Sequence, residues 1–328
     1  MSAVTRADPA NKAGSAHPLA RRRGFGDVSF QVISLVAGLL VLVVLILIVV
    51  STADESTSWF SSVGLSGIFS SNWDEATNHF GAMAFLYGSV ISSVIAIIIA
   101  FPVSIGLALL MTEVLPGRVS RPLVYLIDLL AVVPSVVWGL WGILVLVPWL
   151  QGIYTSIASG VKGIPVLDSL FGGQNVSGAS FFTAGIILAI MIVPIITSLA
   201  REVISTVPAI DKEGAYALGA TRWEMITGSV WPHSQGGVVG AVLIGLGRAL
   251  GETIAAALVI GASAQVTSHL FYTGYSIPAV IANQFGEASG TMRSALIGLG
   301  LFLFVITIIV NLVARGIVTR SARRTRGA

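Results

Sequence analysis

The sequence predicts an all-α integral membrane protein with six transmembrane helices and both termini in the cytoplasm. Composition, apolar stretches and the distribution of basic residues lead to this prediction. Of 328 residues, 55% are hydrophobic and only 10% are charged, whereas a soluble domain has about 25% charged residues. So few charges cannot cover the surface of a water-soluble globule of this size. The composition therefore excludes an ordinary soluble enzyme, a disordered chain and a nucleic-acid-binding domain.

Six stretches are long and apolar enough to cross a bilayer, which takes about 20 residues per helix. They are Ser29–Ser51, Phe80–Thr112, Leu123–Leu150, Phe181–Ser205, Gly236–Ser263 and Met292–Ile317. The second stretch exceeds the required length and contains Pro102, so we expect it to tilt or kink. The first follows three arginines, as a signal peptide would, but its apolar run is too long and no small-residue cleavage site follows it. We therefore expect a retained helix.

Basic residues set the orientation, because cytoplasmic loops are enriched in Lys and Arg. Fifteen of the 18 lie in the two terminal tails and in the loops after the second and fourth stretches. Only Lys162 and Arg293 fall on the other side, and Arg248 lies within a stretch. Both termini are then cytoplasmic, which requires an even number of spans.

The chain divides by composition into four segments. Residues 1–24 are predicted to be a disordered tail, 25–79 a first helix with an outer loop, 80–317 a transmembrane domain, and 318–328 a basic tail. The outer segments before Phe80 and Phe181 look like loops with short interfacial pieces. The chain has no Cys, and its four His residues lack metal-ligand spacing, so we expect no metal site and no cofactor.

The cytoplasmic loop 206–233 is predicted to form two short helices. Pro208 suits a first helical turn, since its missing N–H is not needed there. Gly219 occupies the place of a left-handed C-terminal cap, so the first helix should run from about Ala209 to Leu218.

A second helix is predicted to start after Thr221. Thr221 and Glu224 have the T-x-x-E spacing of a capping box, and Pro232 is expected to end this helix. The residues alone fit either a solvated helical loop lying on the bilayer or a docking element for a partner.

Two charges lie deep in the fifth stretch. Arg248 is 12 residues beyond Gly236, about 18 Å into the membrane, and Glu252 follows one helical turn later. Intramembrane charge suggests function by default. Arg presents donors that fit phosphate oxygens, so an anion site or gate is one interpretation. An i,i+4 ion pair that merely neutralises both charges is the other.

The third stretch contains a further acid and a proline. Asp128 lies about 8 Å inside the cytoplasmic boundary, where it either pairs at the interface or belongs to a pathway. Pro134 should break the helix and free backbone carbonyls, which is tolerated where a cavity is lined.

The loop and the charged span resemble those of a known family. Glu213-Gly214-Ala215, followed by Gly219 and Pro232, resembles the EAA loop of ABC importer permeases, although Gly214, Ser229 and Trp231 depart from its pattern. The strings GLGRALGET (245–253), IDLLAVVPSVVWGLWGI (127–143) and YSIPAVIANQFGEA (275–288) resemble the C-type subunit of phosphate-specific ABC importer permeases.

This resemblance implies a type I ABC importer permease fold over about 80–317 and a role in phosphate uptake. Arg248 would contact phosphate and Glu252 would tune that contact. Further pathway candidates are Asp128, Ser135 and Thr253. The loop would dock on the ATPase through Glu213, Gly214, Ala215, Gly219, Ala220 and Thr221.

The implied partners are a second permease, two cytoplasmic ATPase subunits and an extracytoplasmic phosphate-binding protein. The chain has no G-x4-G-K-[ST] motif, so ATP hydrolysis would belong to a partner and the chain itself is not expected to be an enzyme. A permease for another oxyanion such as sulfate or molybdate, an ion-gradient-driven anion carrier, and a subunit that signals phosphate status remain alternatives.

Overall fold

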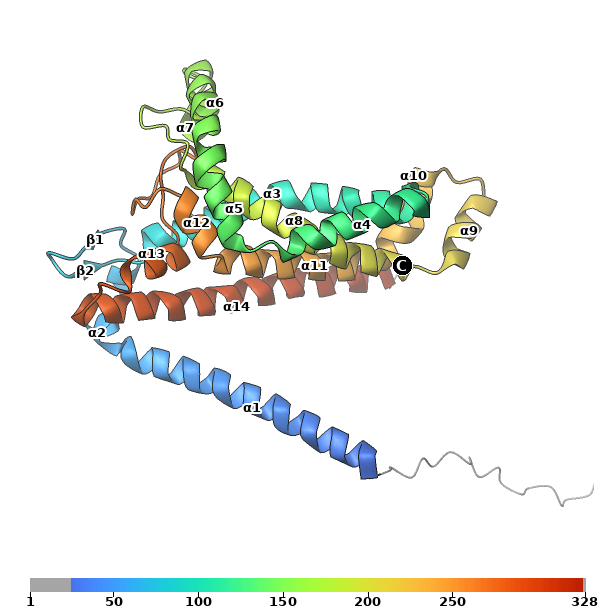
Figure 1. Cartoon of the computed structure of the whole chain (residues 1–328), viewed down its shortest axis with the longest axis horizontal. Helices are drawn as coiled ribbons and strands as arrows, with labels where there is room; N and C mark the ends of the chain where they lie inside the picture. The colour runs from blue at the N-terminus through green and yellow to red at the C-terminus, as the bar shows by residue number, and fades with distance from the viewer. Residues whose placement is uncertain (1–24, 327–328) are drawn as a thin grey trace, which may run out of the picture. The chain divides into compact units, whose positions relative to one another are not determined.

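The computed structural model describes residues 25–326 and is mostly helical (Figure 1). The longer helices are α1 (Phe25–Glu55), α3 (Met83–Leu109), α4 (Gly117–Val132), α6 (Val147–Gly160), α8 (Phe181–Ser205), α11 (Trp231–Gly251) and α14 (Gly290–Arg326). The shorter ones are α2 (Thr57–Ile68), α5 (Ser135–Trp141), α7 (Pro165–Phe171), α9 (Ala209–Ala217), α10 (Arg222–Met225), α12 (Ile254–Val259) and α13 (Ile277–Gln284). Three π-helical turns, η1 (Leu110–Val114), η2 (Gly142–Leu146) and η3 (Ile226–Val230), and one two-stranded hairpin, β1 (Trp73–Asp74) with β2 (His79–Phe80), complete the described elements.

Five helical segments in the described residues are long and apolar enough to span a membrane: Val28–Glu55, Met83–Val114, Ser135–Gly160, Phe181–Ser205 and Gly290–Val313. The fifth predicted span, 236–263, is not among them. Its helix α11 contains several glycines and Arg248, which lower its mean hydropathy, and it ends at Gly251. The count of six spans and the placement of the termini therefore stay predictions.

The chain separates after Ser51 into two units. The first unit contains most of α1, whose most apolar segment has no buried residue. The predicted disordered tail, 1–24, lies outside the described residues. In the second unit, α14 continues to Arg326, so most of the predicted basic tail is helical.

Helices α3 and α8 form the centre of the second unit, and they pack side by side in the same direction. Gly185 of α8 faces Ile95 near the middle of α3, and further along, the Ser104 hydroxyl donates to the Val193 carbonyl at 3.2 Å. Helices α4 and α11 also pack on α8. Glycine and serine at such contacts let helix backbones approach closely, which is how helices associate in lipid.

Each of the three π turns ends two residues before a proline, at Pro116, Pro148 and Pro232. At Pro116 the chain has already left the helix, since Leu115 is extended. At Pro148 and Pro232 the chain stays helical; a proline there cannot donate to the carbonyl four residues back and collides with it, and the wider π turn relieves this conflict. The prediction that Pro232 ends the second loop helix is therefore wrong, because the chain stays helical from α10 through η3 into α11.

Pro134 breaks the third predicted span, as expected. Helix α4 ends at Val132, and α5 begins at Ser135 after two extended residues. The long apolar helical segment here is consequently 135–160, shifted toward the C-terminus from the predicted 123–150.

The outer segment after α1 was predicted to be a loop with short interfacial pieces, and it contains helix α2 and the β1–β2 hairpin. Trp59 of α2 is fully buried, and its indole N–H donates to the Phe80 carbonyl at 2.8 Å. Ser294 of α14 donates to the Glu55 carbonyl at 2.6 Å, and Gly298 leaves room for the Trp59 ring. These contacts hold α2 and the hairpin against the start of α14.

The contact between α3 and α8 predicts a stability difference between two glycine substitutions. A Cβ added at Gly185 would lie 2.6 Å from the Ile95 Cβ, whereas at Gly106 of α3 it would meet nothing within 4 Å. We expect Gly185→Ala to destabilise the protein by about 1–3 kcal/mol, and Gly106→Ala to be neutral or mildly stabilising. Thermal unfolding of both variants in detergent measures this, and equal Tm values would contradict the close packing.

Candidate functional site

Helix α11 stops before Glu252, so the predicted continuous helix 236–263 is wrong. Glu252 has φ −70° and ψ 127°, an extended conformation, and α12 begins two residues later at Ile254. No proline lies at this break. The Glu252 carboxylate compensates in part, because its Oε1 accepts from the Ala255 N–H at 3.5 Å, and the Thr253 hydroxyl donates to the Gly251 carbonyl at 3.3 Å.

An ion pair between Arg248 and Glu252 was one interpretation of the two deep charges, and the structure does not show it. Arg248 lies in the last turn of α11 with an exposed side chain, and Glu252 is half-buried. Among the side chains described, the only ion pair is elsewhere, between Lys212 and Glu113. The Glu252 carboxylate faces the Ala255 N–H, and no ion pair joins it to Arg248 among the described side chains.

The break after α11 lies beside the break after α4. A Cβ at Gly139 of α5 would be 2.9 Å from the Ala255 Cα, and one at Gly142 would be 2.8 Å from a Val259 methyl group. Helices α5 and α12 therefore run in the same direction in close contact (Figure 1). One turn back from Gly139 is Ser135, which this register places at the level of the α11–α12 break.

Asp128 has a structural partner. The Ser198 hydroxyl of α8 donates to its Oδ1 at 3.2 Å, and the Asp128 side chain is half-buried between α4 and α8. The pathway candidates thus come from helices α4, α5 and α11, all of which pack on α8, with Glu252 and Thr253 in the break that follows α11.

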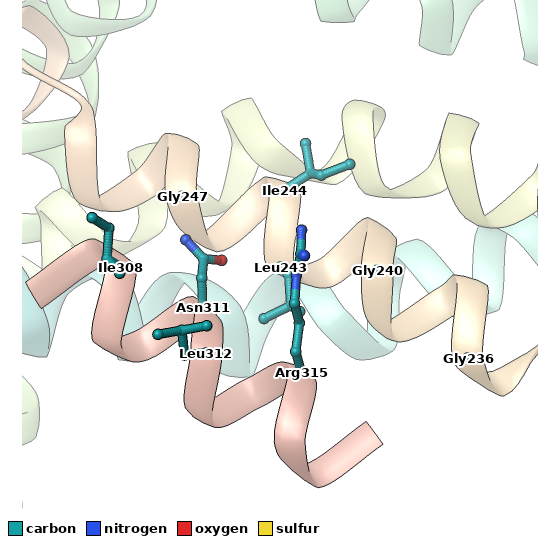
Figure 2. A pocket seen from close by; sticks show the side chains of 9 residues that line it. All are labelled: Gly236, Gly240, Leu243, Ile244, Gly247, Ile308, Asn311, Leu312 and Arg315. Atoms are coloured by element: carbon teal, nitrogen blue, oxygen red, sulfur yellow. The ribbon is translucent and has the colours of Figure 1, made fainter. Parts of the chain in front are cut away.

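A groove of about 610 Å³ runs between α11 and α14. Figure 2 shows glycines along the α11 wall and Arg315 reaching from α14 toward α11. It is lined by Gly236, Gly240, Leu243, Ile244, Gly247, Ile308, Asn311, Leu312 and Arg315. Arg248 lies one helical turn beyond Ile244, on the same side of α11. The groove therefore leads along α11 toward Arg248.

The first loop helix, α9, ends in a Schellman motif. Gly219 has φ +84°, its N–H donates to the Tyr216 carbonyl at 2.9 Å, and the Ala220 N–H donates to the Ala215 carbonyl at 3.1 Å. This is the αL cap expected from Gly219. Glu213 and Gly214 lie exposed on α9, whereas Ala215 is half-buried.

The second loop helix starts with the predicted capping box. The Glu224 N–H donates to the Thr221 hydroxyl at 3.3 Å, and the Thr221 N–H donates to Glu224 Oε2 at 2.8 Å. These hydrogen bonds lower the pKa of Glu224 below its ordinary value of 4.5. Both residues are exposed, and Glu224 also lines a hollow between α9 and the segment from α10 to α11.

The loop 206–233 exposes large apolar side chains. Ile210, Leu218 and Trp223 are 75%, 91% and 70% exposed. The hollow between α9 and the segment from α10 to α11 measures about 880 Å³ and is lined in part by Leu218. Exposed large apolar side chains on a loop with a hollow are typical of a protein-binding site.

The sequence analysis missed the contact that holds this loop to the membrane helices. Lys212 Nζ of α9 donates to Glu113 Oε1 of η1 at 2.6 Å. The two residues are 99 positions apart, and each is unremarkable alone, since a charge at the end of a span usually reaches into water. Only the fold brings them together.

Comparison with known proteins identifies the family. Residues 100–327 match the model of the binding-protein-dependent transport system inner membrane component family. The chain belongs to this family, whose members are non-catalytic membrane components of ABC transporters.

Relatives and solved structures agree with this assignment. The phosphate transport system permease protein PstC of Mesorhizobium japonicum is 42% identical over 99% of both chains, and that of Haemophilus influenzae is 42% identical over 88% of this chain and 91% of its own. A chain of the bacterial alginate ABC transporter has the same fold, with a TM-score of 0.59 and 18% identity over 92% of this chain and 98% of its own. A MetNI methionine ABC transporter chain gives a TM-score of 0.56 at 14% identity over 76% of this chain and 99% of its own.

The capping box predicts an acid-sensitive loop. Because the pKa of Glu224 is lowered by folding, its stabilisation is present above pH 4.5 and is lost as the pH falls through the lower folded-state pKa. We expect amide exchange in residues 218–226, corrected for intrinsic rates, to rise with acidification in the wild type. In Glu224→Gln this acid-dependent rise should be absent, whereas Glu213→Gln should retain it; the same pH dependence in all three proteins would contradict the prediction.

Proposed function

We propose that this chain is a permease subunit of an ATP-driven importer of inorganic phosphate. The proposal rests on one observation above the others: the chain aligns over almost its whole length with proteins named as phosphate transport permeases. The site is consistent with it. An unneutralised arginine lies one turn before a pair of adjacent helix breaks, and broken helices line substrate sites in other transporters.

In this proposal, Arg248 contacts the phosphate. Its planar guanidinium can bond two phosphate oxygens at once, and no carboxylate within the described residues competes for it. Glu252 and Thr253, in the break, and Ser135, at the same level, would supply further polar contacts. Asp128 holds α4 to α8 through Ser198 and has a weaker claim to the pathway.

The loop 206–233 would dock on a cytoplasmic ATPase subunit. Its exposed apolar residues and the hollow beside them support a protein-binding role. The complex would contain a second permease, two ATPase subunits and an extracytoplasmic phosphate-binding protein. Both termini would be cytoplasmic, in an inner or plasma membrane.

Transport into proteoliposomes tests the proposal as a whole. The chain is reconstituted with its permease and ATPase partners, ATP is enclosed, and the binding protein is supplied outside with radiolabelled phosphate. We expect ATP-dependent uptake that excess sulfate does not inhibit. Uptake without ATP would favour an ion-gradient carrier, and inhibition by sulfate would favour a broader oxyanion permease.

Replacing the arginine should stop transport without loss of assembly. We expect Arg248→Ala to lower uptake by about 10- to 100-fold, the loss expected for hydrogen bonds to a charged group. Arg248→Lys should retain part of the activity, since it keeps the charge but not the bidentate geometry. Uptake at the wild-type rate in Arg248→Ala would remove this residue from the mechanism.

Reversing a charge on the loop should weaken ATPase docking. Glu213 is exposed on α9, so Glu213→Lys should leave the fold intact while reducing co-purification of the ATPase and uptake. Glu287→Lys, the same change in an exposed acid between α13 and α14, is the matched control. Normal co-purification and transport in Glu213→Lys would argue against docking through this face.

A further inference from the structure

The ion pair between Lys212 and Glu113 joins the loop to the first central helix. The contact is 2.6 Å long, and the side chains are only 21% and 6% exposed. No other ion pair occurs among the described side chains. A pair shielded to this degree is screened less by salt than one on the surface, and loss of one partner would leave the other charge unpaired in a largely buried place.

Helix α9 has little else to hold it. None of its side chains is fully buried, and only Ala215 packs against the apolar cluster beneath the loop. The Ser229 hydroxyl approaches the Asp211 carbonyl at 3.5 Å, at the limit of a hydrogen bond. Lys212 is therefore the strongest polar link from α9 to the membrane helices.

The neighbouring segment is fixed differently. Met225, Ile226 and Val230 of α10 and η3 are buried in the same cluster, against Ala108 of α3 and Ile204 of α8. Between this fixed segment and α9 lies Gly219 in a left-handed conformation, a natural pivot. Val207, just before α9, is buried in the same cluster, so α9 lies between two anchored segments and Lys212 supplies the ion pair from the helix itself.

The other end of the ion pair is well placed to transmit movement. Glu113 lies in η1, which directly continues α3, and α3 packs along α8. Helix α8 in turn contacts α5, α11 and α12, the helices on either side of the two breaks. A displacement of α9 would thus reach the breaks through elements in continuous contact.

We propose that Lys212 and Glu113 are positioning residues that make α9 and α3 move as one body. They would convert movement of the ATPase into opening of the pathway. This inference rests on the proposed docking of the loop on an ATPase. Because it concerns transmission and not docking, the ATPase should still bind and hydrolyse ATP when the ion pair is lost.

The test compares ATP hydrolysis and phosphate uptake in the same proteoliposomes containing the complete complex. Lys212→Met retains the length of the side chain without its charge, and Glu113→Gln does the same for the acid. We expect each to keep ATP hydrolysis while the phosphate taken up per ATP falls by about tenfold, within the range of typical coupling between sites. The charge swap Glu113→Lys with Lys212→Glu should restore much of the ratio, and Lys162→Met, an exposed lysine before α7, should leave it unchanged.

An unchanged ratio in both single variants would overturn the inference, as would failure of the swap to improve on them. Absence of phosphate uptake by the wild-type complex would instead contradict the proposed function, so the two failures are distinguishable.

A second measurement asks directly whether the two helices move together. The chain has no cysteine, so Glu113→Cys with Lys212→Cys can be joined selectively by a short bismaleimide. If α9 and α3 move as one body, the cross-linked complex transports phosphate with the ratio of the wild type. Loss of transport on cross-linking, with transport present before it, would show that the two helices must separate and would overturn the inference.

Discussion

The close packing of α3 on α8 is the contact on which the rest of the structure depends. Lipid tails are as apolar as leucine, so membrane helices associate through shape and polar contacts and not through burial from water. Gly185 against Ile95, and the Ser104 hydroxyl on a backbone carbonyl, supply both kinds of contact. The same pair of helices then carries α4 and α11 on its sides and the 206–233 loop at its end.

This rigid centre makes two interrupted helices tolerable. Backbone groups freed by a break are costly in hydrocarbon unless protein or water covers them. The structure places the two breaks side by side, with α5 against α12 and both against α8, so each interrupted segment is partly covered by the other. At the second break, the Glu252 carboxylate accepts a backbone N–H that the missing turn of helix would have satisfied. Glu252 thus has a structural task at this break. It lies four residues after Arg248, just past the end of α11.

Short sequence patterns predicted part of the fold. The break at Pro134, the αL cap at Gly219 and the Thr221–Glu224 capping box each depend on residues within a few positions of one another, and each was confirmed. Two predictions were wrong, for different reasons. Pro232 was expected to stop a helix, but a π turn absorbs it. The break at Glu252 has no proline or other strong signal, because tertiary packing of α12 on α5 and α13 determines where this helix begins.

The ion pair between Lys212 and Glu113 was beyond prediction, since nothing near either residue indicates the other. It also shows how a chain with few charges uses them. Within the membrane helices, contacts are made by small and apolar residues that fix one arrangement. Where α9 leaves that packed region, the ion pair of Lys212 with Glu113 ties it to η1. Close packing inside and a polar link that holds at the edge are what the proposed transmission of movement from the loop to whole helices requires.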